Sequence, residues 1–149
     1  MKDKRGFTLI ELIIVLGLAG VVISVVMSFF IANYKSYETI NTESEVQYQS
    51  QYIINYMTNK ILEAKSFEGK TGNQFIFRYS DGKEASFEKD SKKIKYAYDT
   101  EAPVDIGNYV KDINIESSGT NEVRITLILE KGSHDTYSAE QIVYLRNSN

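Results

Sequence analysis

The stretch from Phe7 to Ala32 reads FTLIELIIVLGLAGVVISVVMSFFIA, and it decides how the chain begins to fold. From Leu12 to Ala32 about 21 residues carry no charge, and a helix of that length spans the roughly 30 Å hydrocarbon core of a bilayer. Three basic residues and one acid precede Phe7, at Lys2, Lys4, Arg5 and Asp3. The positive-inside rule therefore predicts a single-pass protein with its N-terminus in the cytoplasm and its C-terminus outside.

The rest of the sequence is polar and rich in Tyr, Lys, Asn, Ser and Glu, so it faces water. A length of 149 residues favours one domain. The net charge is −3, and no long run of one sign resembles a basic stripe, so we expect no direct binding of nucleic acid. Cysteine is absent, which excludes disulfides, thiolate catalysis and cysteine metal sites.

An ordinary secretory signal peptide is the first alternative, because it also combines a basic start with an apolar core. Its apolar core is shorter, and it ends in a small-x-small cleavage site. Here the candidate Ala32 follows the bulky Phe30 by two positions, and Tyr34 comes soon after. This alternative predicts a mature chain that starts near Asn33.

Glu11 is an anomaly, because a carboxylate in an apolar helix costs about 2–4 kcal/mol on insertion scales. One interpretation is that Glu11 lies near the cytoplasmic end of the helix and reaches the interface. The other is that a cation lies close to it. The attraction of such a pair grows as the local dielectric constant falls.

The segment Lys4 to Glu11, KRGFTLIE, together with the apolar run after it, resembles the class III signal of type IV pilins and type II secretion pseudopilins. The resemblance implies that a prepilin peptidase cuts between Gly6 and Phe7 and methylates the new amine of Phe7. It also implies that Glu11 meets the terminal amine of a neighbouring subunit during assembly. The implied partners are other pilin subunits, the peptidase, the inner-membrane assembly machinery and, before assembly, membrane lipid.

The sequence departs from many major pilins in one respect, because no proline interrupts the apolar helix; the single proline is Pro103. Gly17 and Gly20 remain as positions that weaken a helix by up to about 1 kcal/mol each relative to Ala. The alternative explanation for them is close packing between membrane helices, which small residues permit.

After Ala32 a helical pattern continues in amphipathic form, with apolar residues at intervals of three, four and seven. These residues are Val46, Ile53, Met57, Ile61 and Ala64. A second stripe consists of Tyr48, Tyr52 and Tyr56, with Tyr34 and Tyr37 nearer the membrane. We interpret the tyrosines as interface residues, with ligand binding or electron conduction as the alternative. The helix is predicted to stop between Phe67 and Gly72, a polar region with two glycines.

Beyond the helix the pattern changes to alternation, which predicts short strands. The predicted strands cover residues 74–79, 84–89, a run with Ile94, Tyr96 and Tyr98, a run with Val110, Ile113 and Ile115, residues 123–131 and about residues 138–146. We expect a hairpin at Ser80-Asp81-Gly82, a loop over residues 99–108 and a turn over residues 117–121. The predicted fold class is therefore α+β and pilin-like, with a long N-terminal helix packed on a C-terminal antiparallel sheet.

The predicted organisation has four parts: a leader (1–6), a transmembrane and assembly helix (7–32), an amphipathic helix (33–66) and an antiparallel β head (67–149). The closing residues Ile142 to Asn147 are similar to the C-termini of minor pilins and J-type pseudopilins. This likeness favours a minor subunit of a type IV pilus or related filament at the cell surface. The alternatives are a type II secretion or competence pseudopilin, and a membrane-anchored binding domain that does not polymerise.

Few residues in the sequence could support catalysis, so we predict no enzyme activity, no catalytic residue, no cofactor and no metal. The single histidine, His134, lies in a polar stretch without a catalytic companion. Asp99, Glu101 and Asp105 could offer oxygens to a hard cation, but the EF-hand spacing is absent and a solvated loop is the simpler explanation. No nucleotide-binding glycine motif occurs.

Overall fold

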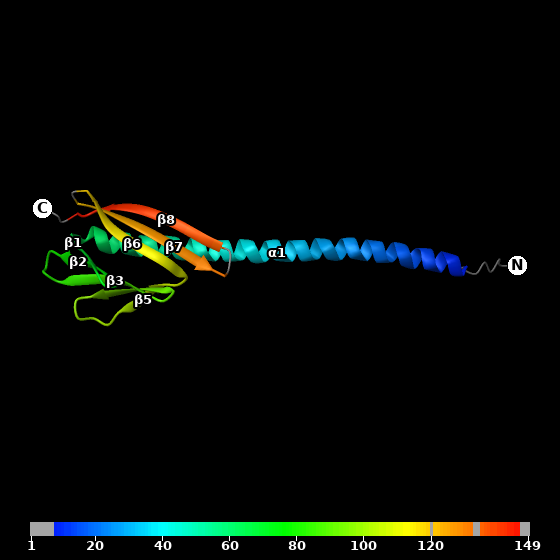
Figure 1. Ribbon diagram of the computed structural model, residues 1–149, viewed down its shortest axis with the longest axis horizontal. Helices are drawn as coiled ribbons and strands as arrows, with labels where there is room; N and C mark the ends of the chain where they lie inside the picture. Colours follow the sequence, from blue (N-terminus) through cyan, green and yellow to red (C-terminus); the bar gives the residue numbers. More distant parts are fainter. Residues whose placement is uncertain (1–7, 120, 133–134, 147–149) are drawn as a thin grey trace. The chain divides into compact units, whose positions relative to one another are not determined.

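The computed structural model describes residues 8–119, 121–132 and 135–146. Within them one long helix is followed by eight strands (Figure 1). The chain divides into two compact units, Met1–Asn41 and Thr42–Asn149. The predicted α+β, pilin-like fold class is confirmed.

Helix α1, Leu9–Leu62, contributes to both units. In the first unit it carries the apolar stretch, whose large side chains from Leu9 to Ile31 are exposed. No proline occurs in α1, so every residue after the first turn can donate its backbone N–H within the helix. The apolar stretch is therefore a regular helix that leaves its side chains to a surrounding apolar phase.

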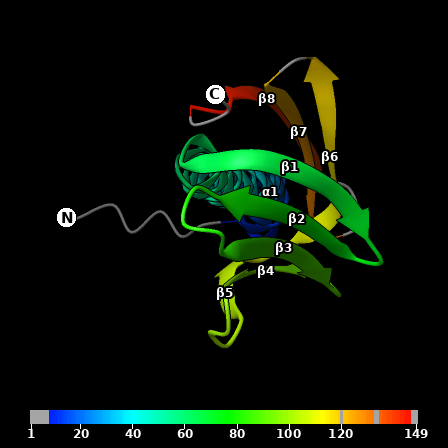
Figure 2. The same ribbon diagram turned by 90° about the vertical axis from the view of Figure 1, so that its left-hand side faces the viewer.

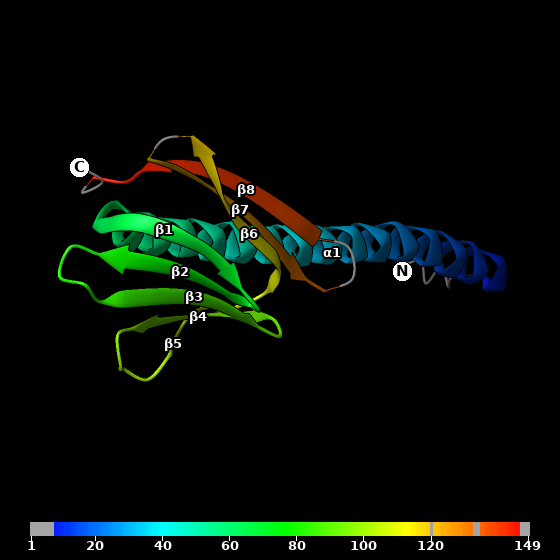
Figure 3. The same cartoon turned by 60° about the vertical axis from the view of Figure 1, so that its left-hand side comes forward.

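The second unit contains the rest of α1 and two antiparallel sheets, one of five strands in the order β1-β2-β3-β4-β5 and one of three in the order β6-β7-β8 (Figure 3). The strands are β1 Ala64–Thr71, β2 Gln74–Tyr79, β3 Glu84–Asp90, β4 Lys93–Tyr98, β5 Val104–Gly107, β6 Val110–Gly119, β7 Glu122–Lys131 and β8 Asp135–Tyr144. The prediction of one sheet therefore needs correction, because the strands form two.

The C-terminal end of α1 differs from the prediction, because the helix ends at Leu62 and residues 64–71 form β1. No glycine or proline marks this end. Two distant groups satisfy the last carbonyls instead: the Tyr79 hydroxyl donates to the Lys60 carbonyl at 2.8 Å, and the Arg146 N–H to that of Leu62 at 3.3 Å. The helix stops where tertiary contacts replace its own hydrogen bonds.

Strand β5 lies inside the segment that was predicted to be a loop, residues 99–108. It pairs with β4, and its Ile106 is buried. A Cβ added at Gly107 would lie 2.3 Å from Ile53 of α1, so the strand passes the helix at a distance that only glycine permits. The loop prediction was wrong because this packing, rather than local sequence, makes the strand.

The other strands lie close to their predicted positions, since alternation places their apolar residues on one face. Strand β6 continues through Gly119, so the turn predicted from Ser117 begins later, and β8 begins at Asp135 rather than near Ser138. The predicted hairpin at residues 80–82 is present. Asp81 anchors it by accepting hydrogen bonds from Lys83 N at 3.0 Å and from the Tyr98 hydroxyl at 2.9 Å.

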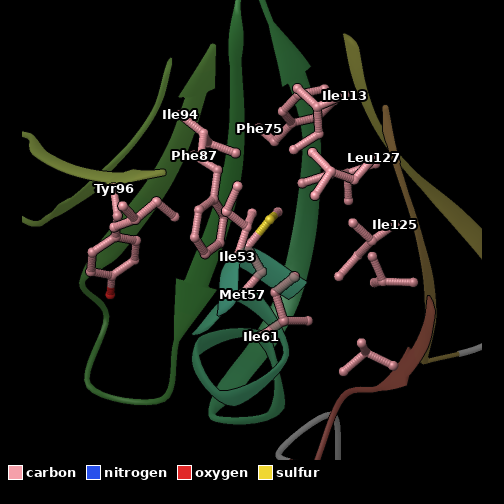
Figure 4. Packing of buried hydrophobic residues seen from close by; sticks show 14 of the residues in the cluster. Ile53, Met57, Ile61, Phe75, Phe87, Ile94, Tyr96, Ile113, Ile125 and Leu127 are labelled. Carbon is pink, nitrogen blue, oxygen red and sulfur yellow. The ribbon is translucent and has the colours of Figure 1, made fainter. Parts of the chain in front are cut away.

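The hydrophobic core of the second unit lies between α1 and the inner faces of the two sheets (Figures 2 and 4). Figure 4 shows Ile53, Met57 and Ile61 of α1 below Phe87 of one sheet and Leu127 of the other. The three helix residues are fully buried. Each would contribute about 1.5–3 kcal/mol on full burial, so the amphipathic half of α1 is a central part of this unit.

Candidate functional site

Glu11 lies in the first turn of α1, where its side chain closes a capping box with Thr8. The Glu11 Oε2 atom accepts hydrogen bonds from the Thr8 backbone N–H at 3.1 Å and from the Thr8 hydroxyl at 3.0 Å. In return the Glu11 N–H donates to the Thr8 Oγ1 atom at 3.3 Å. The carboxylate is thus fixed at the helix N-terminus, where the helix dipole also favours a negative charge.

The stretch after Glu11 lies in a helix that is long and apolar enough to cross a membrane, and its apolar side chains are not buried within the protein. Its polar side chains bond to the helix itself. Ser24 donates to the Val21 carbonyl at 2.7 Å, and Ser28 to that of Ser24 at 2.8 Å. Such internal satisfaction is what a lipid environment demands of polar groups.

The predicted processing residues Gly6 and Phe7 and the leader, residues 1–6, lie outside the described residues, as does His134. Gly17 and Gly20 are on α1, and a Cβ at either would meet no atom within 4 Å among those described. The role of Glu11 as an assembly residue remains a prediction. The Glu11 carboxylate bonds to Thr8, and Thr8 directly follows Phe7, the predicted first residue of the mature chain, in the sequence.

The acidic residues of the 99–108 segment do not converge. Asp105 pairs with Lys93 at 2.5 Å, whereas Asp99 lies 4.0 Å from Lys83 on another hairpin. Glu101 donates its backbone N–H to the Tyr98 carbonyl at 3.0 Å in a turn. Among the residues that the structure describes, no group of three or more His, Asp or Glu could hold a metal ion.

The burial of the tyrosine side chains in the stripe varies along α1. Tyr56 is half-buried, and its ring packs edge-on against Tyr96 at 5.6 Å between centroids. Tyr52 leans on Tyr56 at 6.4 Å and is 47% exposed, whereas Tyr48 is 67% exposed. Tyr34 and Tyr37 in the first unit are exposed as well. The stripe is therefore a core contact at one end and an open surface at the other.

A polar cluster that the sequence analysis missed ties α1 to the ends of β6 and β7. Glu45 accepts hydrogen bonds from Lys131 and, at 2.8 Å, from the Tyr109 hydroxyl. The Lys131 ammonium also lies 5.2 Å from the centre of the Tyr109 ring. We call Glu45, Tyr109 and Lys131 the helix latch. Only the fold brings these residues together, so no local pattern could have revealed the cluster.

The charges of the helix latch support one another. The hydrogen bond from Lys131, and to a smaller degree the one from Tyr109, holds the pKa of the Glu45 carboxyl below its ordinary value. The bond to Glu45 raises the pKa of Lys131, and the same carboxylate raises the pKa of the Tyr109 phenol. At neutral pH the three groups are thus held as carboxylate, ammonium and neutral phenol, which is the combination that their hydrogen bonds require.

The fold and the N-terminal site together define an α+β, pilin-like protein whose single apolar helix begins with a capped carboxylate. In a comparison with protein families, residues 1–27 match the family described as the Prokaryotic N-terminal methylation motif. No curated protein and no solved structure matches the chain. The motif supports a type IV pilin-like or pseudopilin precursor, and it points to a structural subunit rather than an enzyme.

Proposed function

We propose that the chain is cut between Gly6 and Phe7, methylated at the new amine and built as a minor structural subunit into a type IV pilus or related filament. The observation that carries this proposal is the methylation motif over residues 1–27 together with a carboxylate in the first turn of α1. Before assembly, the apolar stretch of α1 holds the subunit in the membrane, with residues after it outside. The assembly machinery and neighbouring subunits are its partners.

The mechanism follows from the position of Glu11. Both hydrogen bonds from Thr8 end on the Oε2 atom, so within the described residues the Oε1 atom accepts none. Cleavage creates a positive amine at Phe7, and an amine on a neighbouring subunit can reach the remaining lone pairs. Each charge alone is costly in lipid, whereas a pair with good geometry recovers much of that cost. Assembly is thereby favoured in the register that brings the two together.

Mass spectrometry of the intact protein and its N-terminal peptide, from native membranes and from sheared surface material, tests the proposal. The expected mature chain starts at N-methylated Phe7 and is present in the sheared fraction. A chain that keeps Met1 would indicate a membrane anchor that does not enter the pathway. A start near Asn33 would show that a secretory signal had been removed. Either of these results contradicts the proposal.

A Gly6→Leu variant supplies the matched control, because the cleavage site is the only part that it changes. In a host with the peptidase, we expect the precursor to accumulate at its full mass while membrane insertion stays normal. Processing of this variant at the wild-type rate would remove the main support for cleavage after residue 6.

A further inference from the structure

The exposed end of the tyrosine stripe borders a cleft of about 360 Å³ in the second unit. Its lining residues are Tyr48, Gln49 and Tyr52 of α1, Lys93 of β4, and residues 105–108. We call it the tyrosine cleft. The proposed assembly function makes no use of it.

The aromatic wall of the tyrosine cleft is held in place from behind. Tyr52 leans on Tyr56, and Tyr56 packs edge-on against Tyr96, which is 7% exposed. Because Tyr52 contacts Tyr56, its ring needs little further ordering on binding, and this lowers the entropic cost of a contact. Tyr48 stands one helical turn earlier and extends the same wall.

The opposite side of the cleft is also rigid. Gly107 passes so close to Ile53 that a Cβ could not fit, and Ile106 beside it is buried. This contact holds β5 against α1. A cleft of this size, with polar side chains beside two tyrosines, is large enough for a small ligand.

The charges around the cleft favour a neutral ligand. Its two ionised side chains, Lys93 and Asp105, are paired with each other at 2.5 Å. Neither is left as a counter-charge for an ionic ligand. The remaining polar side chains are the amides of Gln49 and Asn108 and the two phenols, which donate and accept hydrogen bonds without net charge.

We propose that the tyrosine cleft binds a neutral sugar unit, either free or as part of a polysaccharide. A pyranose ring has an apolar face of C–H groups, which stacks on a tyrosine ring, and a rim of hydroxyls, which bond to amides and to a paired carboxylate. An ionic ligand would have to break the Lys93–Asp105 pair. An aliphatic ligand would leave the amides unpaired, at a cost of about 1–3 kcal/mol per group.

Saturation-transfer NMR on the full-length protein tests this proposal, in a zwitterionic detergent whose headgroup contains no sugar. The probes are cellobiose, N,N′-diacetylchitobiose and maltose, with a sialylated trisaccharide as the acidic comparison. We expect transfer to the C–H protons of one ring face in at least one neutral probe. Pull-down with cellulose, chitin or starch shows whether the protein also binds the polymer of that sugar. Binding of the polymer, or of the free disaccharide alone, supports a sugar site in the cleft.

Three variants locate the binding. Tyr52→Ala should weaken it about tenfold, whereas Tyr52→Phe keeps the ring and should stay close to wild type. Tyr144→Ala is the matched control, because Tyr144 is an exposed tyrosine of β8 outside the cleft. The proposal is overturned by no transfer to any neutral probe, by a preference for the acidic probe, or by unchanged binding in Tyr52→Ala. Self-association that depends on Tyr48 and Tyr52, without sugar binding, would assign the surface to a second copy instead.

Discussion

At the C-terminal end of α1, a single side chain supplies a hydrogen bond to a carbonyl that the helix itself leaves unpaired. The Tyr79 hydroxyl, donated to the Lys60 carbonyl, takes the place of a capping glycine. Burial is the main cause that raises the pKa of this phenol, so it remains a donor across the physiological range. One hydroxyl therefore helps to decide where the helix ends and β1 begins.

Replacing Tyr79 by Phe removes this donor while the ring packing is kept. We expect the second unit to lose about 1 kcal/mol of unfolding free energy, measured by urea denaturation of the full chain followed by tyrosine fluorescence. Tyr48→Phe, at an exposed position of α1, is the comparison and should change stability little. Equal stability of the two variants would show that the capping bond contributes nothing.

Gly107 is the second position at which a single-atom change, here an added Cβ, should alter stability. A Cβ there would lie 2.3 Å from both the Cδ1 and the Cγ1 atoms of Ile53. Gly107→Ala should therefore cost about 1–3 kcal/mol through overpacking. Gly119→Ala is the matched control, because its nearest atom belongs to the flexible Glu122 side chain at 3.2 Å.

A double-mutant cycle with Ile53→Ala identifies the cause of the Gly107 effect. If the two side chains collide, the cost of the double variant should fall short of the sum of the single costs by more than about 0.5 kcal/mol. Additive costs would mean that Gly107 is needed for some other reason than its approach to α1.

At the scale of elements, the helix latch joins α1 to the ends of β6 and β7 through three polar groups. The folded-state pKa of Glu45 is depressed below 4.5. Its contribution to stability is therefore complete above the unfolded-state pKa and is lost as the pH falls through the folded-state value. Asp81, Asp90 and Glu130 also have lowered pKa values, so acid weakens the unit at several points.

Glu45→Gln separates the latch from these other carboxylates. The unfolding free energy of the wild type should fall as the pH drops below about 4.5, the ordinary pKa of a glutamate, and that of the variant should fall less steeply. At pH 7 the variant should be less stable, because Lys131 has lost its charged partner. Parallel pH profiles, measured by chemical denaturation, would mean that the latch does not couple folding to the charge of Glu45.

The elements also show what the sequence could predict. Alternation located β2, β3, β4 and β7 well, because one face of each strand packs on the core. The end of α1 was misplaced since its cap comes from Tyr79 and Arg146, far along the chain. The four residues of β5 read as a loop, and their strand depends on the contact between Gly107 and α1. Division into two sheets depends on strand pairing, which local patterns do not encode.

The hydrogen bonds at the start of α1 are local, because Thr8 and Glu11 lie on one helical turn and have the spacing of a capping box, which the structure forms. The assembly role of Glu11 stays a prediction. The helix latch is the opposite case, since Glu45 and Lys131 are 86 positions apart and have no local signature. The tyrosine stripe was recognised as a pattern, but only the fold separates Tyr56 in the core from Tyr48 at the surface.

For the whole molecule, the proposed role of Glu11 predicts that insertion and assembly respond differently to its loss. Glu11→Gln removes the charge, so insertion into the membrane should be unchanged or improved. Incorporation into filaments should fall about tenfold or more, because the amine of a neighbour is left without a partner. The measurement is the ratio of variant in sheared filaments to variant in membranes.

Glu43→Gln is the control for that experiment, since it removes a carboxylate from the same helix outside the apolar stretch. It should be incorporated like the wild type. If Glu11→Gln also assembles normally, pairing between the carboxylate and the amine cannot be the force that sets the register.

The hydrogen bond from Arg146 to Leu62 has a consequence for the order in which the protein is made. Residue 62 leaves the ribosome well before residue 146, so the Leu62 carbonyl at the end of α1 gains this partner only after residues 63–146 have been made. The second unit therefore completes the end of its helix late in synthesis, and a chain that stops short of residue 146 lacks this hydrogen bond.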